Sequence, residues 1–191
     1  MFGFSRSKQK NKAPVAHEWH WTPRLWQSDC SDHLGGPIAS NTPLCDGISI
    51  FHDGAAEHLI VSQSKDEDVF VVDIDTLQSG LGYYSLVAQI PDGVAHSLTR
   101  EHIIEFSADI TGHGGAVYIR LNLGYGPNVE QVNILSYTKD NRDCAEFDLW
   151  YTKLNKNQME RAWLDIIFDK PEQGGVRISN LSLTRRRRAQ F

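Results

Sequence analysis

The second half of the chain consists of six runs in which apolar and polar residues alternate. They read HIIEFSADI (His102–Ile110), AVYIRLNL (Ala116–Leu123), VEQVNILSYT (Val129–Thr138), AEFDLWYTKL (Ala145–Leu154), RAWLDIIF (Arg161–Phe168) and GVRISNLSL (Gly175–Leu183). Gly, Pro, Asn and Asp punctuate them. Alternation with a period of two, bounded by turn-forming residues, predicts half-buried antiparallel strands.

Four shorter runs of the same kind precede these six. They are Ile48–His52, His58–Gln63, Val69–Asp75 and Tyr83–Ile90. No stretch predicts a helix of ten residues. About ten strands in two groups favour an all-β fold, a two-sheet antiparallel β-sandwich (jelly roll), because a single open sheet of that size would leave long edges exposed.

We divide the 191 residues into four parts. Residues 1–14 form a flexible basic arm, 15–45 an aromatic strap and loop, 46–184 the β-sandwich domain, and 185–191 a basic C-terminal tail. The strap contains Trp19, Trp21 and Trp26, large side chains that are costly to leave in water. We expect them to pack across the sandwich, and the alternative is an exposed platform that docks a protein partner.

Charge is unevenly distributed along the chain. Four of the 19 basic residues lie in the N-terminal arm and four in Arg185–Arg188, which leaves 11 basic against 24 acidic residues in the body. Nucleic acid is an unfavourable partner for such a body, because phosphate contacts require Lys and Arg on the contacting face. The two basic ends would suit an anionic surface or an acidic partner, but we expect solvated tails.

The sequence contains neither a secretory signal nor a membrane-spanning run. We expect a cytoplasmic protein, or a component of an assembly that is exported by another route. Cys30, Cys45 and Cys144 are scattered, and no His or Cys cluster has the spacing of a metal site. A Cys30–Cys45 bridge is an option in an oxidising compartment, but we expect buried free thiols.

Alternation also predicts a candidate binding face, because residues i and i+2 of a strand share a side. One face would combine flat aromatic rings with amides, an Arg and carboxylates: Tyr118, Arg120, Asn122, Gln131, Asn133, Tyr137, Asp148, Trp150, Trp163 and Asp165. Trp and Tyr stack on the C–H faces of pyranoses, while amides, Arg and Asp pair with hydroxyls. The alternative is an ordinary polar face whose cross-strand pairs only stabilise the sheet.

The same runs resemble known strands. Glu105–Ile110, Tyr118–Leu123, Trp163–Phe168 and Val176–Leu183 are similar to strands of the jelly-roll carbohydrate-binding modules and galactose-binding-like domains. The last strand of those families often reads apolar-x-apolar-x-Asp/Asn-apolar-x-apolar, which Ile178–Leu183 matches. The resemblance covers residues 46–184 and implies glycan binding, or membership of a bacterial family that shares only the fold.

No cofactor is indicated by the residues themselves. Many of the similar modules hold a structural calcium ion, so the resemblance implies calcium as an option. Asp29, Asp32, Asp46 and Asp165 would supply carboxylates, although their spacing does not require a site.

Catalysis is a third hypothesis. Some jelly-roll glucanases carry Glu-x-Asp-x-x-Glu or Glu-x-Asp-x-Glu on one strand, and Glu146 and Asp148 match the first two acids. The third position holds Trp150 or Tyr151, so a glycoside hydrolase is not favoured. The sequence therefore predicts a non-catalytic protein that binds glycan or polysaccharide through the candidate face. The alternative is a structural or protein-interaction module that docks through Trp19, Trp21, Trp26 and the basic tails.

Overall fold

The computed structural model describes residues 18–77, 80–154 and 159–189. The predicted arm at residues 1–14 lies outside these ranges. The strands are β1 Trp19–Trp21, β2 Thr42–Cys45, β3 Ile48–His52, β4 Leu59–Asp66, β5 Val69–Thr76, β6 Tyr83–Ile90, β7 His102–Thr111, β8 Ala116–Tyr125, β9 Asn128–Leu135, β10 Tyr137–Lys139, β11 Arg142–Asp148, β12 Met159–Asp169 and β13 Gly174–Arg187. The helical segments are η1 Arg24–Trp26, η2 Ser31–His33, η3 Ala56–His58, α1 Asp92–Ala95 and η4 Leu149–Tyr151.

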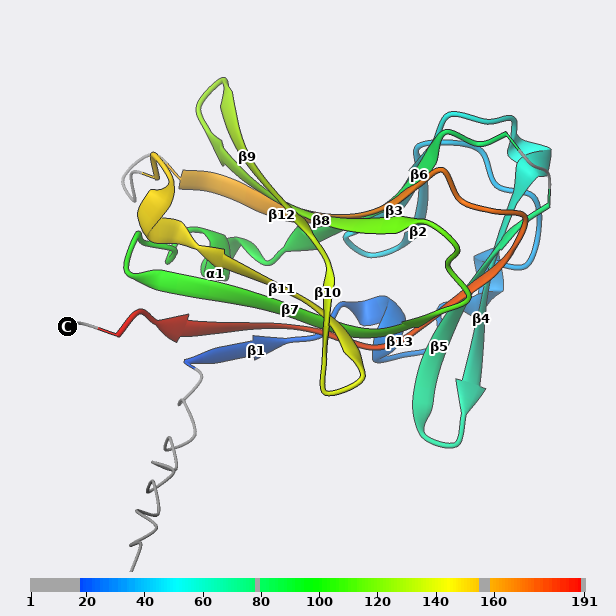
Figure 1. The fold of residues 1–191 in the computed structure, drawn as a ribbon, viewed down its shortest axis with the longest axis horizontal. Helices are drawn as coiled ribbons and strands as arrows, with labels where there is room; N and C mark the ends of the chain where they lie inside the picture. Colours follow the sequence, from blue (N-terminus) through cyan, green and yellow to red (C-terminus); the bar gives the residue numbers. More distant parts are fainter. Residues whose placement is uncertain (1–17, 78–79, 155–158, 190–191) are drawn as a thin grey trace, which may run out of the picture.

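The strands form two antiparallel sheets that stack face to face (Figure 1). Sheet A has the order β10-β11-β7-β13-β5-β4, and β1 pairs with the second half of β13. Sheet B has the order β2-β3-β6-β12-β8-β9. The predicted all-β sandwich of the jelly-roll type is confirmed. No described helix is long and apolar enough to cross a membrane.

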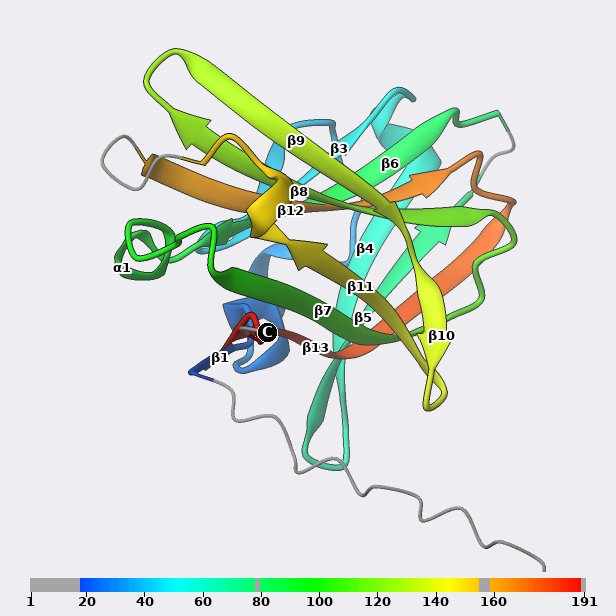
Figure 2. The ribbon, with the colours of Figure 1, turned by 60° about the vertical axis from the view of Figure 1, so that its left-hand side comes forward.

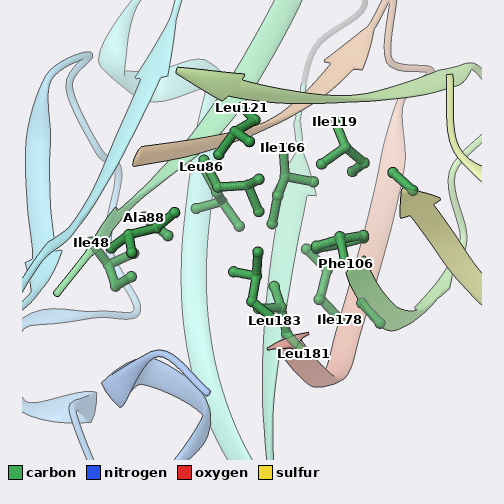
Figure 3. Close-up of a cluster of buried hydrophobic side chains, with 14 of the residues drawn as sticks. Ile48, Leu86, Ala88, Phe106, Ile119, Leu121, Ile166, Ile178, Leu181 and Leu183 are labelled. Carbon is green, nitrogen blue, oxygen red and sulfur yellow. The ribbon is translucent and has the colours of Figure 1, made fainter. Parts of the chain in front are cut away.

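The core lies between the sheets and follows the alternation of the sequence. From sheet B, Leu86, Ile119 and Ile166 point towards Phe106, Ile178 and Leu183 of sheet A (Figure 3). These side chains are almost fully buried. Each such side chain contributes roughly 1.5–3 kcal/mol relative to an exposed one. The same period of two places the intervening residues on the two outer faces of the sandwich.

A bulge in β13 keeps this alternation in phase. The register with β7 shifts between Ser179 and Ser182, and Asn180 adopts φ +50°. Asn tolerates this left-handed backbone better than most residues. Its amide donates to Asp109 Oδ2 at 2.6 Å. Because one residue is looped out, Leu181 and Leu183 both face the core on the far side of the bulge.

The aromatic strap packs on the protein's own body, as predicted. Trp26 is buried, and its indole N–H donates to the Ile178 carbonyl at 3.0 Å. Trp19 and Trp21 lie in β1, where they are half-buried and stack with ring centroids 6.1 Å apart. The sequence did not predict β1 or β2 as strands, because both are short and lie among turn-forming residues.

The C-terminal boundary of the sandwich needs correction. Residues 185–191 were expected to be a solvated tail, but β13 continues through Arg185, Arg186 and Arg187, which pair with β7. The arginines also form ion pairs: Arg185 and Arg187 with Glu18, Arg186 with Glu105 and Glu146, and Arg188 with Asp148. The alternating apolar pattern ends at Leu183, so hydrophobicity alone could not reveal a strand continued by ion pairs.

Substitution of Arg186 tests this correction. Its side chain is 17% exposed and lies 2.8 Å from both Glu105 and Glu146. Arg186→Ala leaves two neighbouring carboxylates without the cation between them, and we expect a loss of about 1–3 kcal/mol in urea unfolding.

The matched control is Arg177→Ala, earlier in the same strand. Arg177 is 47% exposed and pairs with Asp66 and Asp73. Such exposed pairs contribute roughly 0–1 kcal/mol. Equal losses for the two variants would show that the Arg186 pairs do not hold the end of β13.

Candidate functional site

Seven of the ten predicted binding residues share the outer face of sheet B. They are Tyr118, Arg120 and Asn122 of β8, Gln131 and Asn133 of β9, and Trp163 and Asp165 of β12. Their positions alternate with core residues such as Ile119 and Leu164. We call this surface the sheet B face; it is the upper side of the upper layer in Figure 1.

The strand register places these side chains in cross-strand rows. One row contains Asp165, Arg120 and Asn133, which are Cα partners from β12 to β9. The next row contains Trp163, Asn122 and Gln131 in the same order. Directly opposed residues in neighbouring strands are close enough for their side chains to interact.

Hydrogen bonds join the two rows into one network. Arg120 Nε donates to Asn133 Oδ1 at 2.8 Å, and Arg120 Nη1 lies 3.6 Å from Asp165 Oδ2. Asn122 Nδ2 donates to Asp165 Oδ2 at 3.0 Å. Gln131 Nε2 donates to Asn122 Oδ1, also at 3.0 Å. These hydrogen bonds therefore fix the orientation of the polar side chains.

Asp165 is the buried carboxylate of this network and is 8% exposed. Burial raises the pKa of the Asp165 carboxyl above its ordinary value, although the Asn122 amide and the Arg120 charge act in the opposite direction. Asn122 beside it is fully buried, whereas Gln131 and Asn133 are exposed. The network thus runs from a buried carboxylate to exposed amides.

An open groove of about 680 Å³ adjoins the network. Its polar lining includes Arg120 and Asp165, and its apolar lining comes from Phe51 of β3, Tyr83 and Val87 of β6, and Ile167 of β12. Cross-strand pairing explains the arrangement, because Val87 is the partner of Asp165 and Ile167 the partner of Tyr118. An apolar strip therefore lies directly beside fixed polar groups.

The groove also contains a hydroxyl that lacks a partner. Ser85 lines it from β6, and its buried Oγ makes no hydrogen bond to any described residue. A buried hydroxyl without a partner is unfavourable and uncommon.

The alternation did not lead us to Phe51, Tyr83, Ser85, Val87 or Ile167. The outward-facing residues of β3 and β6 are mixed in polarity and form no distinctive pattern. Their relevance depends on the strand order, in which β3 pairs with β6 and β6 pairs with β12. The second of these pairings joins segments that are far apart in the sequence.

The prediction that all ten residues share one face is wrong for Tyr137, Asp148 and Trp150. The chain leaves sheet B after Leu135, so Tyr137 begins β10 in sheet A. β11 lies next to it in sheet A and ends at Asp148, and Trp150 lies in η4 instead of a strand. The predicted strand at residues 145–154 therefore stops early, because Asp148 caps η4 by accepting from the Trp150 backbone N–H at 3.1 Å.

Trp150 is nevertheless exposed, at 46%. The guanidinium groups of Arg100 and Arg188 lie 5.0 and 5.3 Å from its ring centroid. These cation–π contacts occupy the ring with the protein's own cations. Trp163 is half-buried on the sheet B face, with the Arg161 guanidinium 5.4 Å from its ring centroid.

The two acids that resemble a glucanase motif are engaged in ion pairs. Glu146 Oε2 lies 2.8 Å from Arg186 Nη2, and Asp148 Oδ2 lies 3.0 Å from Arg188 Nε. Both are on sheet A, away from the groove.

Metal-binding geometry is absent from the described residues, where no three His, Cys, Asp or Glu side chains come together. Of the four Asp residues considered for calcium, Asp29 accepts hydrogen bonds from Ser31, Asp46 pairs with Arg24, and Asp165 belongs to the network above.

Comparison with known proteins gives a family. A family model described as a family of unknown function, DUF6478, matches residues 4–191. The chain belongs to this family. Curated proteins provide no match to this DUF6478 chain.

Solved structures share its fold. The enzymatically active domain of tailspike protein 4 from bacteriophage CBA120 is similar with a TM-score of 0.51 and 9% identity, over 85% of this chain and 22% of that chain. A family 30 carbohydrate-binding module has a TM-score of 0.48 and 10% identity, over 87% of this chain and 90% of that chain. The family 11 module of a cellulosomal cellulase of Clostridium thermocellum has a TM-score of 0.43 and 11% identity, over 80% of this chain and 95% of that chain. Two of these three structures are carbohydrate-binding modules.

Replacement of the buried carboxylate tests the electrostatics of the network. A folded-state pKa raised above the unfolded value of about 3.9 means that Asp165 favours folding at low pH, and that this contribution is lost as the pH rises through the folded pKa. Asp165→Asn keeps the shape and still accepts from Asn122. We expect the free energy of unfolding of Asp165→Asn minus that of the wild type to be more positive at pH 7 than at pH 3.5. Urea unfolding at the two pH values measures it.

Arg120→Ala provides the opposite change, because it leaves the Asp165 carboxylate without its cation. This variant should be least stable relative to the wild type at pH 7. If Asp165→Asn instead lost more stability at pH 7 than at pH 3.5, the carboxylate would be net stabilising and the burial argument would be wrong.

Proposed function

We propose that this protein binds carbohydrate through the sheet B face and does so without catalysis. The observation that carries the proposal is the apolar strip of Phe51, Val87 and Ile167 beside the fixed network of Arg120 and Asp165. A pyranose likewise has apolar C–H faces beside a polar rim of hydroxyls. The groove and a pyranose therefore match in chemistry.

Unused hydrogen-bonding capacity supports the proposal. Among the contacts of the described residues, Asn133 uses its Oδ1 and Gln131 its Nε2. The Asn133 amide N–H groups and the Gln131 Oε1 therefore remain for a ligand. Donors and acceptors in fixed planes suit the paired hydroxyls of a sugar.

The size and openness of the groove indicate the kind of ligand. Its volume of about 680 Å³ is within the usual range for small-molecule sites. It is a groove on a sheet and not a closed cavity, so a chain could extend beyond it at either end. We propose an oligosaccharide or polysaccharide as the ligand.

Docking of a protein through the strap receives less support. Trp26 is 7% exposed, and Trp19 and Trp21 pack against the core. The basic C-terminal residues pair with the protein's own acids. These groups have intramolecular roles that a partner would have to displace.

A pair of Trp variants tests the proposal. We expect a glycan array to identify a ligand, and that ligand to quench tryptophan fluorescence. Trp163→Ala should then raise the Kd about 10-fold or more, since an aromatic contact contributes on the order of 1.4 kcal/mol in a binding site.

The control is Trp150→Ala, which removes the same side chain from the other sheet. It should leave the Kd unchanged while its unfolding midpoint confirms that it folds. A ligand whose binding depends on Trp150 and not on Trp163 would contradict the proposal, as would an array without binding to any glycan.

A further inference from the structure

Two of the three cysteines lie in contact at one side of the sandwich. Cys30 immediately precedes η2, and Cys45 is the last residue of β2. Their Sγ atoms are 2.6 Å apart, and both are free thiols that are partly exposed. The prediction of buried free thiols is therefore wrong about their burial. Cys144 lies in β11 of sheet A, where its Sγ is 3.9 Å from the Ser107 hydroxyl.

We propose that Cys30 and Cys45 form a site of reversible covalent modification. A small-molecule disulfide such as oxidised glutathione converts the thiol pair into an intramolecular disulfide. The proposal does not depend on carbohydrate binding, because neither cysteine lines the groove on the sheet B face.

Cys30 is held in place by sheet A. The Gln63 side chain, from β4, accepts from the Cys30 backbone N–H at 2.7 Å. The same Gln63 amide donates to the carbonyls of Leu25 and Ser28, at 2.7 and 3.0 Å. One side chain therefore fixes the loop that carries the Cys30 thiol.

Cys45 is held by sheet B. It is the Cα partner of Ile48 at an irregularity in the β2–β3 pairing. β4 and β2 are edge strands of their respective sheets. A Cys30–Cys45 disulfide would thus tie the loop that is fixed at the edge of sheet A to the edge of sheet B.

The segment between the two cysteines already follows these edges. Gly35 N donates to Val61 O at 2.7 Å, and Ile38 N donates to Leu59 O at 3.0 Å, so the segment covers β4. It then reaches β2, whose final residue is Cys45. The thiols are brought together by the folded backbone, and closing the bond requires little rearrangement.

The reaction balances as two thiol–disulfide exchanges. The thiolate of one cysteine attacks a sulfur of oxidised glutathione, the glutathione S–S bond breaks, and one glutathione thiolate leaves. The second cysteine's thiolate then attacks the protein sulfur of the mixed disulfide and displaces the second glutathione. The two cysteines lose two protons and two electrons, and the products are one protein disulfide and two reduced glutathione molecules.

The surroundings of the pair indicate how the reaction depends on pH. Burial raises the pKa of the Cys45 thiol to about 11, and its contact with Cys30 acts in the same direction. The nearby Arg24 guanidinium, which pairs with Asp46 at 2.5 Å, acts in the opposite direction. Because the thiolate is the attacking species, disulfide formation should accelerate as the pH is raised from 7 to 9.

Thiol mapping of the full chain tests the proposal. The purified protein is incubated with oxidised glutathione, its remaining thiols are alkylated, and the peptides are analysed by mass spectrometry. We expect a cross-linked pair of peptides containing Cys30 and Cys45, a mass lower by two hydrogen atoms, and alkylation of Cys144. Dithiothreitol should restore alkylation at Cys30 and Cys45.

The stability of the oxidised protein gives a second readout. Closing a loop of this size should raise the folded-to-unfolded ratio on the order of 100-fold. The matched variants are Cys30→Ser, Cys45→Ser and Cys144→Ser. Only Cys144→Ser should retain the cross-link and the gain in stability on oxidation.

Three results would overturn the proposal. The first is alkylation of both Cys30 and Cys45 after prolonged oxidation at pH 9. The second is a glutathione adduct on either cysteine that does not resolve into the cross-link. The third is a disulfide that includes Cys144, which would show that the protein rearranges before it is oxidised.

Discussion

Burial of apolar side chains between the two sheets is the constraint on which this molecule depends. Leu86, Ile119 and Ile166 from one sheet meet Phe106 and Ile178 from the other, and nearly all their surface is removed from water. Each strand must therefore direct alternate residues inward, and the others are left on one of two outer faces. The bulge at Asn180 shows how strictly this requirement is met, because the backbone adopts a left-handed conformation there to keep the core residues in phase.

The two outer faces differ in the interactions of their polar residues. On sheet A, Arg186 and Arg188 neutralise Glu146 and Asp148, and the ion pairs fasten the last strand (Figure 2 shows β13 between β7 and β5). On sheet B, the polar side chains form a hydrogen-bonded network around Asp165 with unused donors and acceptors, and an apolar groove lies beside it. We attribute a binding role to the second face for this reason.

Alternation in the sequence was sufficient to predict the fold class and seven members of the sheet B face. Alternation was insufficient at two places where a strand ends. Asp148 ends β11 by capping η4, and the chain changes sheets between Leu135 and Tyr137. Alternation also could not show that Phe51 and Tyr83 line the same groove as Asp165, because strand order depends on contacts between distant segments. The extension of β13 was hidden for another reason, since ion pairs and not apolar side chains stabilise it.

The central claim is that a glycan occupies the sheet B face. The most direct measurement is the chemical-shift perturbation of the 15N-labelled protein during titration with the oligosaccharide found by array screening. The account predicts shifts at the Trp163 indole and along β6, β8 and β12, while the Trp150 indole signal stays in place. Perturbations centred on Trp150 and β11, with the sheet B face unchanged, would contradict it.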